Sequence, residues 1–309
     1  MPVISVIIPS YNSETTIEKC LDSLQNQSYQ DKYEIILVDS SQDRTAKTVS
    51  EYFPNVKLIH LDEKTDPGSA RNIGIREARG DLIAFIDSDC VAGQDWLERI
   101  AVAHQSSYKV VGGSVSQHSD RDGLAARAGY ISEFREFIPQ RPKGEVTHIA
   151  ACNISYKRRT FDEYGLFNRE YYPQEDLIYN TNLVTGGEKI LFDPEIGVHH
   201  HTRSTMKDFL QHQKMIGMIT ARVLKVAPLE GSSIVRRPTL ALFLLPVLPL
   251  VKFFRTLRVF LKFQPETIVK HPLVLPVFAV GLIFWAFGFA RGIYGANEVK
   301  DKTRIEHSA

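Results

Sequence analysis

The sequence predicts an α/β protein with a mixed, mostly parallel sheet, followed by C-terminal hydrophobic helices. The first observation is that short apolar segments rich in β-branched residues alternate with helical segments. The second is that two long uncharged runs lie close to the C-terminus. With 309 residues, of which 24% are charged, the chain is long enough to bury a full core. A soluble α/β unit with an apolar C-terminal region is therefore expected.

The first part of the chain alternates regularly between strand and helix. Apolar runs that end in polar residues predict buried parallel strands at residues 3–12, 33–43, 56–62 and 81–89. Helical spacing follows three of these runs, at residues 16–27, 44–53 and 69–80. Ligands of parallel sheets bind beyond the carboxyl ends of the strands. The polar residues at those ends are therefore candidates for a site: Asn12, Asp39, Asp62, Asp87 and Asp89.

The alternation becomes less regular after about residue 110. Further strands are predicted at residues 110–117, 148–158 and 189–201. The segments between them are expected to mix helix and loop. A long helix with roughly periodic apolar residues is predicted at residues 206–226. These elements complete the expected α/β domain, which we place at residues 1–225.

A second, membrane-associated helical region is expected at residues 226–309. Its hydrophobic runs cover residues 238–251 and 272–290, and the second is long enough to span a bilayer. Prolines interrupt the first run, and the connector between the runs is basic, which conflicts with a plain hairpin whose connector lies outside. We expect re-entrant or interfacial helices rather than a hairpin. Core helices of a soluble protein are the other interpretation.

Charge and cysteine content indicate the partners and the cellular compartment to expect for this chain. Residues 206–309 contain 15 Lys and Arg against 6 Asp and Glu, while the remaining residues contain 22 (37 − 15) against 30 (36 − 6). A basic, apolar tail favours an anionic membrane surface over nucleic acid as a partner. Three scattered cysteines, without a CxxC pair, argue against disulfides and a cysteine zinc site. Because no signal peptide is visible, we expect the N-terminal unit in the cytoplasm.

The sequence GDLIAFIDSDC contains the strongest local signal. Asp87 and Asp89 follow a buried strand, and two carboxylates at a strand end suit Mg²⁺ or Mn²⁺ together with phosphate oxygens. Asp39 ends another strand at the same expected edge, where its carboxylate could accept a hydrogen bond from a nucleobase or ribose. A helix cap or turn is the alternative for each of these aspartates.

Five motifs, in order, resemble family 2 glycosyltransferases over about residues 3–225. They are VISVIIPSYNSETTIEKCLDSL, EIILVDSSQDRT, DPGSARNIGIREARGDLIAFIDSDC, ACNISYKRRTFDEYGLFN and QEDLIYNTNLVTGGEKILFDPEIGVHHH. The resemblance implies a Rossmann-like GT-A fold, a nucleotide-diphosphate sugar donor and inverting transfer. It also implies that Pro9, Tyr11 and Asp39 hold the base and ribose of the donor, and that Arg71 contacts the nucleotide or diphosphate.

The same resemblance implies the metal ligands and the catalytic base. Asp87 and Asp89 match the metal motif of the family, with Asp89 as the more direct ligand. Asp176 matches the base that takes the proton of the acceptor hydroxyl, although an acidic first turn of a helix is the alternative. The motif GVHHH selects His200 as a metal or diphosphate contact. His201, or a solvated strand end, remains open.

The sequence departs from the family at two points. Asn182 occupies the place where an arginine usually follows the base, which puts the usual mode of donor or acceptor binding in doubt. The Gln-x-x-Arg-Trp signature of processive members is absent, so transfer of one sugar per encounter is expected.

The expected function is that of a metal-dependent, non-processive hexosyltransferase at the cytoplasmic face of a membrane. The acceptor would be a lipid-linked saccharide or another envelope-glycan precursor in polysaccharide biosynthesis. A polyprenyl-phosphate glycosyl synthase is the second possibility, and a catalytically silent membrane scaffold of the same fold is the third. The retained Asp87, Asp89 and Asp176 argue against the scaffold. A nucleotidyltransferase is disfavoured because no glycine-rich phosphate loop opens the chain.

Overall fold

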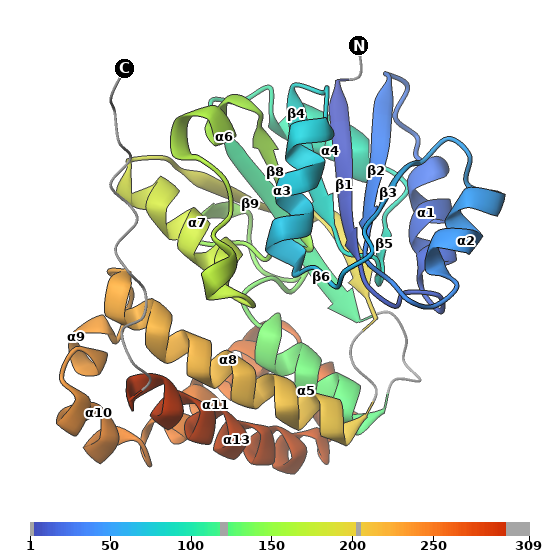
Figure 1. Cartoon of the computed structure of the whole chain (residues 1–309). Coiled ribbons are helices and arrows are strands. Elements are labelled where there is room, and N and C mark those ends of the chain that lie inside the picture. The colour runs from blue at the N-terminus through green and yellow to red at the C-terminus, as the bar shows by residue number, and fades with distance from the viewer. Residues whose placement is uncertain (1–2, 118–122, 202–204, 295–309) are drawn as a thin grey trace.

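The computed structural model describes residues 3–117, 123–201 and 205–294, and a nine-stranded sheet forms its centre (Figure 1). The strand order is β3-β2-β1-β4-β8-β6-β9-β5, with β7 beside β9. The strands are β1 (Ile4–Ser10), β2 (Tyr33–Asp39), β3 (Lys57–His60), β4 (Leu82–Ile86), β5 (Cys90–Ala92), β6 (Val110–Gln117), β7 (Gly144–Val146), β8 (Asn153–Lys157) and β9 (Ile190–His200).

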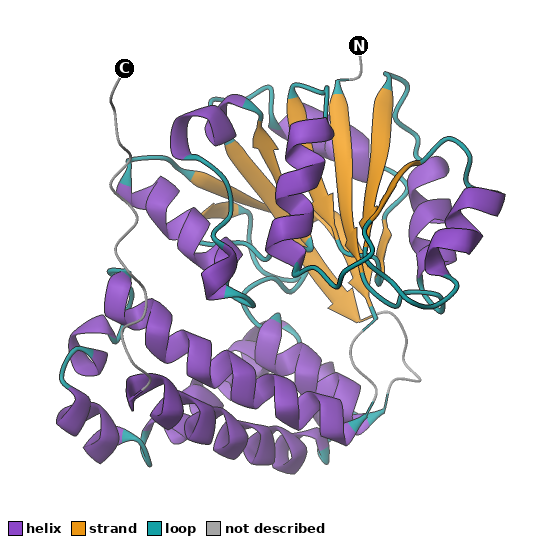
Figure 2. Cartoon of the chain, in the orientation of Figure 1, coloured by secondary structure: helices purple, strands orange, loops and turns teal. Residues whose placement is uncertain are grey.

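Helices cover the sheet and form a separate layer beneath it (Figure 2). The helices of the sheet region are α1 (Ile17–Gln25), α2 (Thr45–Tyr52), α3 (Pro67–Glu77), α4 (Trp96–Ala103), α6 (Arg159–Tyr164), the short η1 (Arg169–Tyr171) and α7 (Glu175–Thr185). The C-terminal layer contains α8 (Met206–Val226), α9 (Ser232–Val235), α10 (Pro238–Leu244), α11 (Leu248–Phe263), α12 (Glu266–Val269) and α13 (Val274–Tyr294). Helix α5 (Leu124–Glu133) lies in this lower layer, where it contacts α8 and α13 (Figure 1). Residues 295–309 of the expected C-terminal region lie outside the described residues.

The expected α/β class with a mixed, mostly parallel sheet is confirmed. Strand β1 pairs in parallel with β2 and β4, and its residues are buried throughout, as expected for a strand covered on both faces. Ser10 at the end of β1 is in register with Asp39 at the end of β2. The parallel arrangement therefore brings the residues that follow β1, β2 and β4 to one edge of the sheet.

Two short strands, β5 and β7, were not predicted. Each has three residues, which is too few for an alternating pattern to be recognised in the sequence. Strand β5 begins at Cys90, directly after the two aspartates, and pairs antiparallel with β9 so that Cys90 lies opposite His200. This pairing joins the loop after β4 that contains Asp87 and Asp89, here called the aspartate loop, to the histidines at the end of β9.

The two hydrophobic runs form different structures. The run at residues 238–251 is divided between α10 and the start of α11, and these two helices are bent by 60°. The run at residues 272–290 forms most of α13, which is long and apolar enough to cross a membrane. However, 39% of the most apolar window of α13 is buried inside the protein. Length and composition alone therefore do not decide whether α13 spans a membrane.

Helix α13 packs closely along α8 in the layer beneath the sheet (Figure 1). Glycines make this contact possible, because a Cβ on Gly217 would lie 2.0 Å from the carbonyl oxygen of Trp285, and a Cβ on Gly292 would lie 2.2 Å from that of Met218. Phe278 and Leu282 of α13 belong to the same buried cluster as the sheet residues. The C-terminal helices therefore share a core with the α/β unit.

We predict that Gly288→Ala destabilises the protein by about 1–3 kcal/mol, because the added Cβ would lie 1.9 Å from the carbonyl oxygen of Lys214 on α8. Thermal unfolding of the full chain in detergent measures the loss. Gly144→Ala is the matched control, since a Cβ there meets nothing within 4 Å. Equal stability of the two variants would contradict backbone contact between α8 and α13.

Candidate active site

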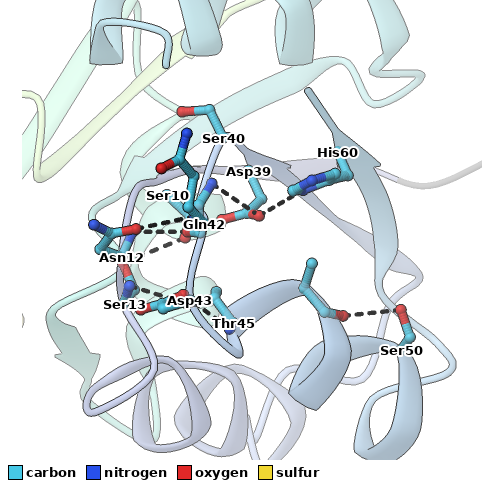
Figure 3. A network of polar contacts seen from close by, with 12 residues as sticks. Ser10, Asn12, Ser13, Asp39, Ser40, Gln42, Asp43, Thr45, Ser50 and His60 are labelled. Carbon is cyan, nitrogen blue, oxygen red and sulfur yellow. Dashed lines mark hydrogen bonds and ion pairs between the residues drawn. The ribbon is translucent and has the colours of Figure 1, made fainter. Parts of the chain in front are cut away.

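A buried carboxylate network lies at the ends of β1 and β2 (Figure 3). Asp39 is fully buried, and its two oxygens accept hydrogen bonds from the hydroxyl and the backbone N–H of Ser41. The Nδ1 atom of His60 lies 2.8 Å from Asp39 Oδ2. The N–H of Asn12 donates to the Ser41 hydroxyl at 2.7 Å, which ties the loop after β1 to the loop after β2. Asp39 is thus fixed at the expected edge.

Tyr11 extends the same edge toward solvent. Its side chain is exposed, and the Lys64 ammonium lies 4.1 Å from the centre of its ring. Pro9, two residues earlier, is buried within β1. The predicted donor residues Pro9, Tyr11 and Asp39 therefore lie at one edge of the sheet. Their contact with a nucleotide remains a prediction.

Arg71 lies in a buried ion-pair network rather than on an open surface. Its guanidinium is 4% exposed, donates to Asp87 Oδ1 at 2.6 Å and donates to Glu175 Oε1 at 3.0 Å. Asp87 follows β4, Arg71 belongs to α3, and Glu175 begins α7. One side chain therefore joins the aspartate loop to the helix that carries Asp176. The predicted contact of Arg71 with the donor stays a prediction.

The charges of this network shift the pKa values of its members. Burial alone would lower the pKa of Arg71, but Asp87 and Glu175 outweigh it and hold that pKa above its ordinary value. Burial, followed by repulsion from Asp176, raises the pKa of Glu175 to about 7, although Arg71 opposes the shift. Arg71 is therefore the charge that favours the ionised form of Glu175 against burial and the neighbouring Asp176.

The second aspartate of the pair lies in a different group. One ligand atom each from Asp89, Cys90 and His200 lies within 4.8 Å of the others, and His200 Nε2 is 3.5 Å from Asp89 Oδ1. The antiparallel pairing of β5 with β9 produces this arrangement. The structure thus brings Asp89 and His200 together as the sequence predicted, whereas Asp87 is held by Arg71.

The chemistry of this group fits a divalent cation. The Asp89 side chain is 39% exposed and the His200 side chain is 9% exposed, and a carboxylate together with an imidazole is a ligand set that suits divalent cations. The Phe134 ring lies 4.9 Å from the ring of His200 and covers it. Burial, then a hydrogen bond with Cys152, raises the pKa of Cys90, so this residue is a thiol rather than a thiolate ligand.

Asp176 lies in the first turn of α7. Its Oδ2 accepts a hydrogen bond from the N–H of Ala151 at 2.9 Å, and its Oδ1 accepts one from the N–H of Leu177 at 2.7 Å. These bonds fix the direction of a partly exposed carboxylate. Both alternatives considered for Asp176, an acidic first turn and a catalytic base, are compatible with this geometry.

The sequence did not reveal two further residues near Asp176. Glu175 was visible only as its neighbour, and its pairing with Arg71 joins segments 104 residues apart. His148 is the other residue: Asn180 donates to its Nδ1 at 3.1 Å, because the Asn180 oxygen accepts from the Tyr156 hydroxyl. A neutral His148 therefore carries its proton on Nε2. The segment THIAACN contains no local pattern that would predict the hydrogen bond between His148 and Asn180.

We predict that Arg71→Met destabilises the protein by about 3–5 kcal/mol, because it leaves the carboxylates of Asp87 and Glu175 without their buried cation. Denaturant titration measures the loss. Glu175→Gln is the matched comparison, since its amide oxygen still accepts from Arg71, and we expect less than half of that loss. A larger loss in Glu175→Gln than in Arg71→Met would show that the network does not depend on the guanidinium.

Known proteins share both the sequence motifs and the fold. The chain is 29% identical over 227 residues to "Glycosyltransferase AglE" of Haloferax volcanii, covering 70% of this chain and 72% of that protein. It is 26% identical over 241 residues to a Methanococcus voltae protein named "Dolichyl N-acetyl-alpha-D-glucosaminyl phosphate 3-beta-D-2,3-diacetamido-2,3-dideoxy-beta-D-glucuronosyltransferase", covering 68% of this chain and 70% of that protein.

A solved structure matches nearly the whole chain. It is the mannosyltransferase PcManGT of Pyrobaculum calidifontis in complex with GDP-Man and Mn²⁺, with a TM-score of 0.62, 18% identity and coverage of 95% of this chain and 87% of that one. At this identity the match establishes the GT-A fold. The model of the family described as "Glycosyl transferase family 2" matches residues 5–165, more than half of the chain. The chain therefore belongs to glycosyl transferase family 2.

Proposed function

We propose that this glycosyltransferase transfers one hexose-type sugar, with inversion, from a nucleotide-diphosphate sugar to a lipid-linked saccharide or another envelope-glycan precursor. One observation carries the proposal: Arg71 joins Asp87 of the aspartate loop to Glu175, the direct neighbour of Asp176. The donor side and the proposed base are therefore held in a fixed relation. Positioning of this kind is a large part of the catalysis of group transfer.

Each residue has a defined task in this proposal. Tyr11 and Asp39 hold the nucleoside, while Asp89 and His200 hold a divalent cation. That cation supplies a Lewis acid for the diphosphate leaving group. Asp176 accepts the proton of the attacking acceptor hydroxyl through a lone pair that its backbone hydrogen bonds leave free. A ligand set that includes an imidazole favours Mn²⁺ over Mg²⁺.

The lipid-linked acceptor is supported by the name of one relative and by the surface of the C-terminal helices. The Methanococcus voltae relative is named for transfer to a dolichyl-linked saccharide phosphate. In this chain, the C-terminal layer exposes large apolar side chains: Phe243, Val247, Leu250, Val251, Phe254, Leu261, Val269, Leu273, Ile283 and Phe287. Such a large exposed apolar surface is characteristic of a protein or membrane contact. Direct transfer to a lipid phosphate is the second candidate, and the cationic side of α11 favours it.

The C-terminal layer is proposed to lie on the cytoplasmic membrane face rather than to cross the bilayer. Helix α13 is in backbone contact with α8, whose Lys207, Asp208 and Lys214 would have to enter the hydrocarbon with it. Exposed Arg258, Lys262 and other basic residues on and near α11 suit anionic headgroups. An interfacial arrangement keeps these charges in contact with water and headgroups while it covers the apolar side chains.

Activity tests the catalytic assignment. We expect the detergent-solubilised full chain to release nucleotide diphosphate from at least one nucleotide sugar when Mn²⁺ and a lipid extract are present. Asp176→Asn should reduce that rate by about 10²–10⁴-fold, because the acceptor proton has no base, while nucleotide binding is retained. Asp162→Asn, an exposed acidic residue of α6, is the control.

Three results would contradict this proposal or a part of it. Absence of release with every donor, with and without lipid extract, would refute the enzymatic function. Wild-type transfer rates in Asp176→Asn would refute the assignment of the base alone. Chelation of metal should abolish release and added Mn²⁺ should restore it, and full activity after chelation would contradict the metal site.

Membrane attachment has its own test. We expect the double variant Phe254→Glu/Phe287→Glu to dissociate from anionic vesicles in flotation assays, because both side chains are 62% exposed in the C-terminal layer. Tyr52→Glu is the control, since Tyr52 is 68% exposed on α2, which belongs to the sheet region. Flotation of the double variant to the same extent as Tyr52→Glu would contradict the proposed membrane surface.

A further inference from the structure

Lys252 of α11 is a partly buried basic residue packed against an aromatic ring. Its ammonium lies 4.8 Å from the centre of the Trp285 ring. Glu133 is the acidic residue whose charge acts on this ammonium, while Arg135 acts on it as a like charge. An ammonium that lies over an aromatic ring still directs part of its N–H groups away from the ring. Lys252 therefore keeps its capacity to bind an anion.

A second cation lies near Lys252. Arg135 follows α5, and its guanidinium donates to the Thr256 hydroxyl on α11 at 3.2 Å and to Glu136 at 3.1 Å. Thr256 is one helical turn after Lys252, so both residues present their side chains from the same side of α11. The Arg135 guanidinium is a like charge that disfavours the charged form of Lys252.

This arrangement is electrostatically costly within the protein alone. Two partly buried cations repel each other, and burial disfavours the charge of each. Glu133 is the acidic residue that offsets the charge of Lys252, but it also lies 3.4 Å from His212. A bound anion with several oxygens would remove the repulsion and satisfy the free donors of both side chains.

The two cations belong to segments that also contain a contact with His200 and exposed apolar side chains. Phe134, the residue before Arg135, packs its ring 4.9 Å from the ring of His200. On the other side, α11 carries the exposed Leu250, Phe254 and Leu261. An anion held by Lys252 and Arg135 would therefore be bound next to the segment whose Phe134 contacts His200. An attached lipid chain could extend along α11.

We propose that Lys252 and Arg135 form the binding site for the phosphate or diphosphate that links the acceptor to its lipid. Lys252 contributes a point charge, and Arg135 contributes the N–H groups that Thr256 and Glu136 leave free. This inference rests on the proposed transfer to a lipid-linked acceptor. The diphosphate of the sugar donor is the other source of the same chemistry, and the experiment separates the two.

The experiment measures binding to the full chain in detergent by calorimetry, with farnesyl phosphate, farnesol, inorganic phosphate and uridine and guanosine diphosphates as probes. We expect Lys252→Met and Arg135→Gln each to weaken farnesyl phosphate binding at least tenfold. Binding of the nucleoside diphosphates should not change in these variants. Lys252→Arg, which keeps the charge, should bind farnesyl phosphate within threefold of the wild type.

Lys262→Met is the matched control. Lys262 lies on the same helix, and its ammonium is also 4.8 Å from an aromatic ring centre, that of Phe263, but the residue is exposed. Wild-type affinity for farnesyl phosphate in Lys252→Met would overturn the inference, and so would equal losses in Lys252→Met and Lys262→Met. Loss of nucleoside diphosphate binding in Lys252→Met would assign the cations to the donor instead. Failure of the wild type to bind any nucleoside diphosphate would refute the proposed function itself.

Discussion

The arrangement of the candidate active site depends on one buried guanidinium. Arg71 is the buried cation that pairs with both Asp87, which belongs to the aspartate loop, and Glu175, which begins the helix of the proposed base. Without it, burial and mutual repulsion would protonate or displace these carboxylates. Three segments that are distant in the sequence therefore share one electrostatic centre. Arg71 holds the loop that carries Asp89 and the helix that carries Asp176, and so fixes the positions of both residues.

The sheet supplies the second constraint. Its parallel half brings the loops after β1, β2 and β4 to one edge, and its antiparallel half returns β9 to the same region. Asp89, Cys90 and His200 lie close together because the short strand β5 pairs with β9 and places Cys90 opposite His200. The loops after β1 and β2 carry the proposed donor residues, and the loop after β4 together with the end of β9 carries the proposed metal ligands.

Much of this arrangement could be predicted from the sequence. Apolar strands ending in Asp39 and Asp87 have a clear local pattern, and the order of the motifs led to Asp89, His200 and Asp176. The pairing of Arg71 with Glu175 could not be predicted, because it joins residues 104 positions apart and each has a plausible local role. Neither could β5, whose three residues contain too little periodicity. The contact between α8 and α13 depends on glycines, whose packing partners are not encoded in a hydropathy pattern.

The glycine contact between α8 and α13 has a consequence for how the molecule unfolds. Because Phe278 and Leu282 of α13 share a buried cluster with the sheet, the C-terminal helices are not a detachable tail. Shortening the chain at residue 225 would expose the face of α8 that contains Gly217 and the buried Phe209. The helical layer and the sheet should instead open as one cooperative unit, so their slowest amides would exchange with solvent at similar rates.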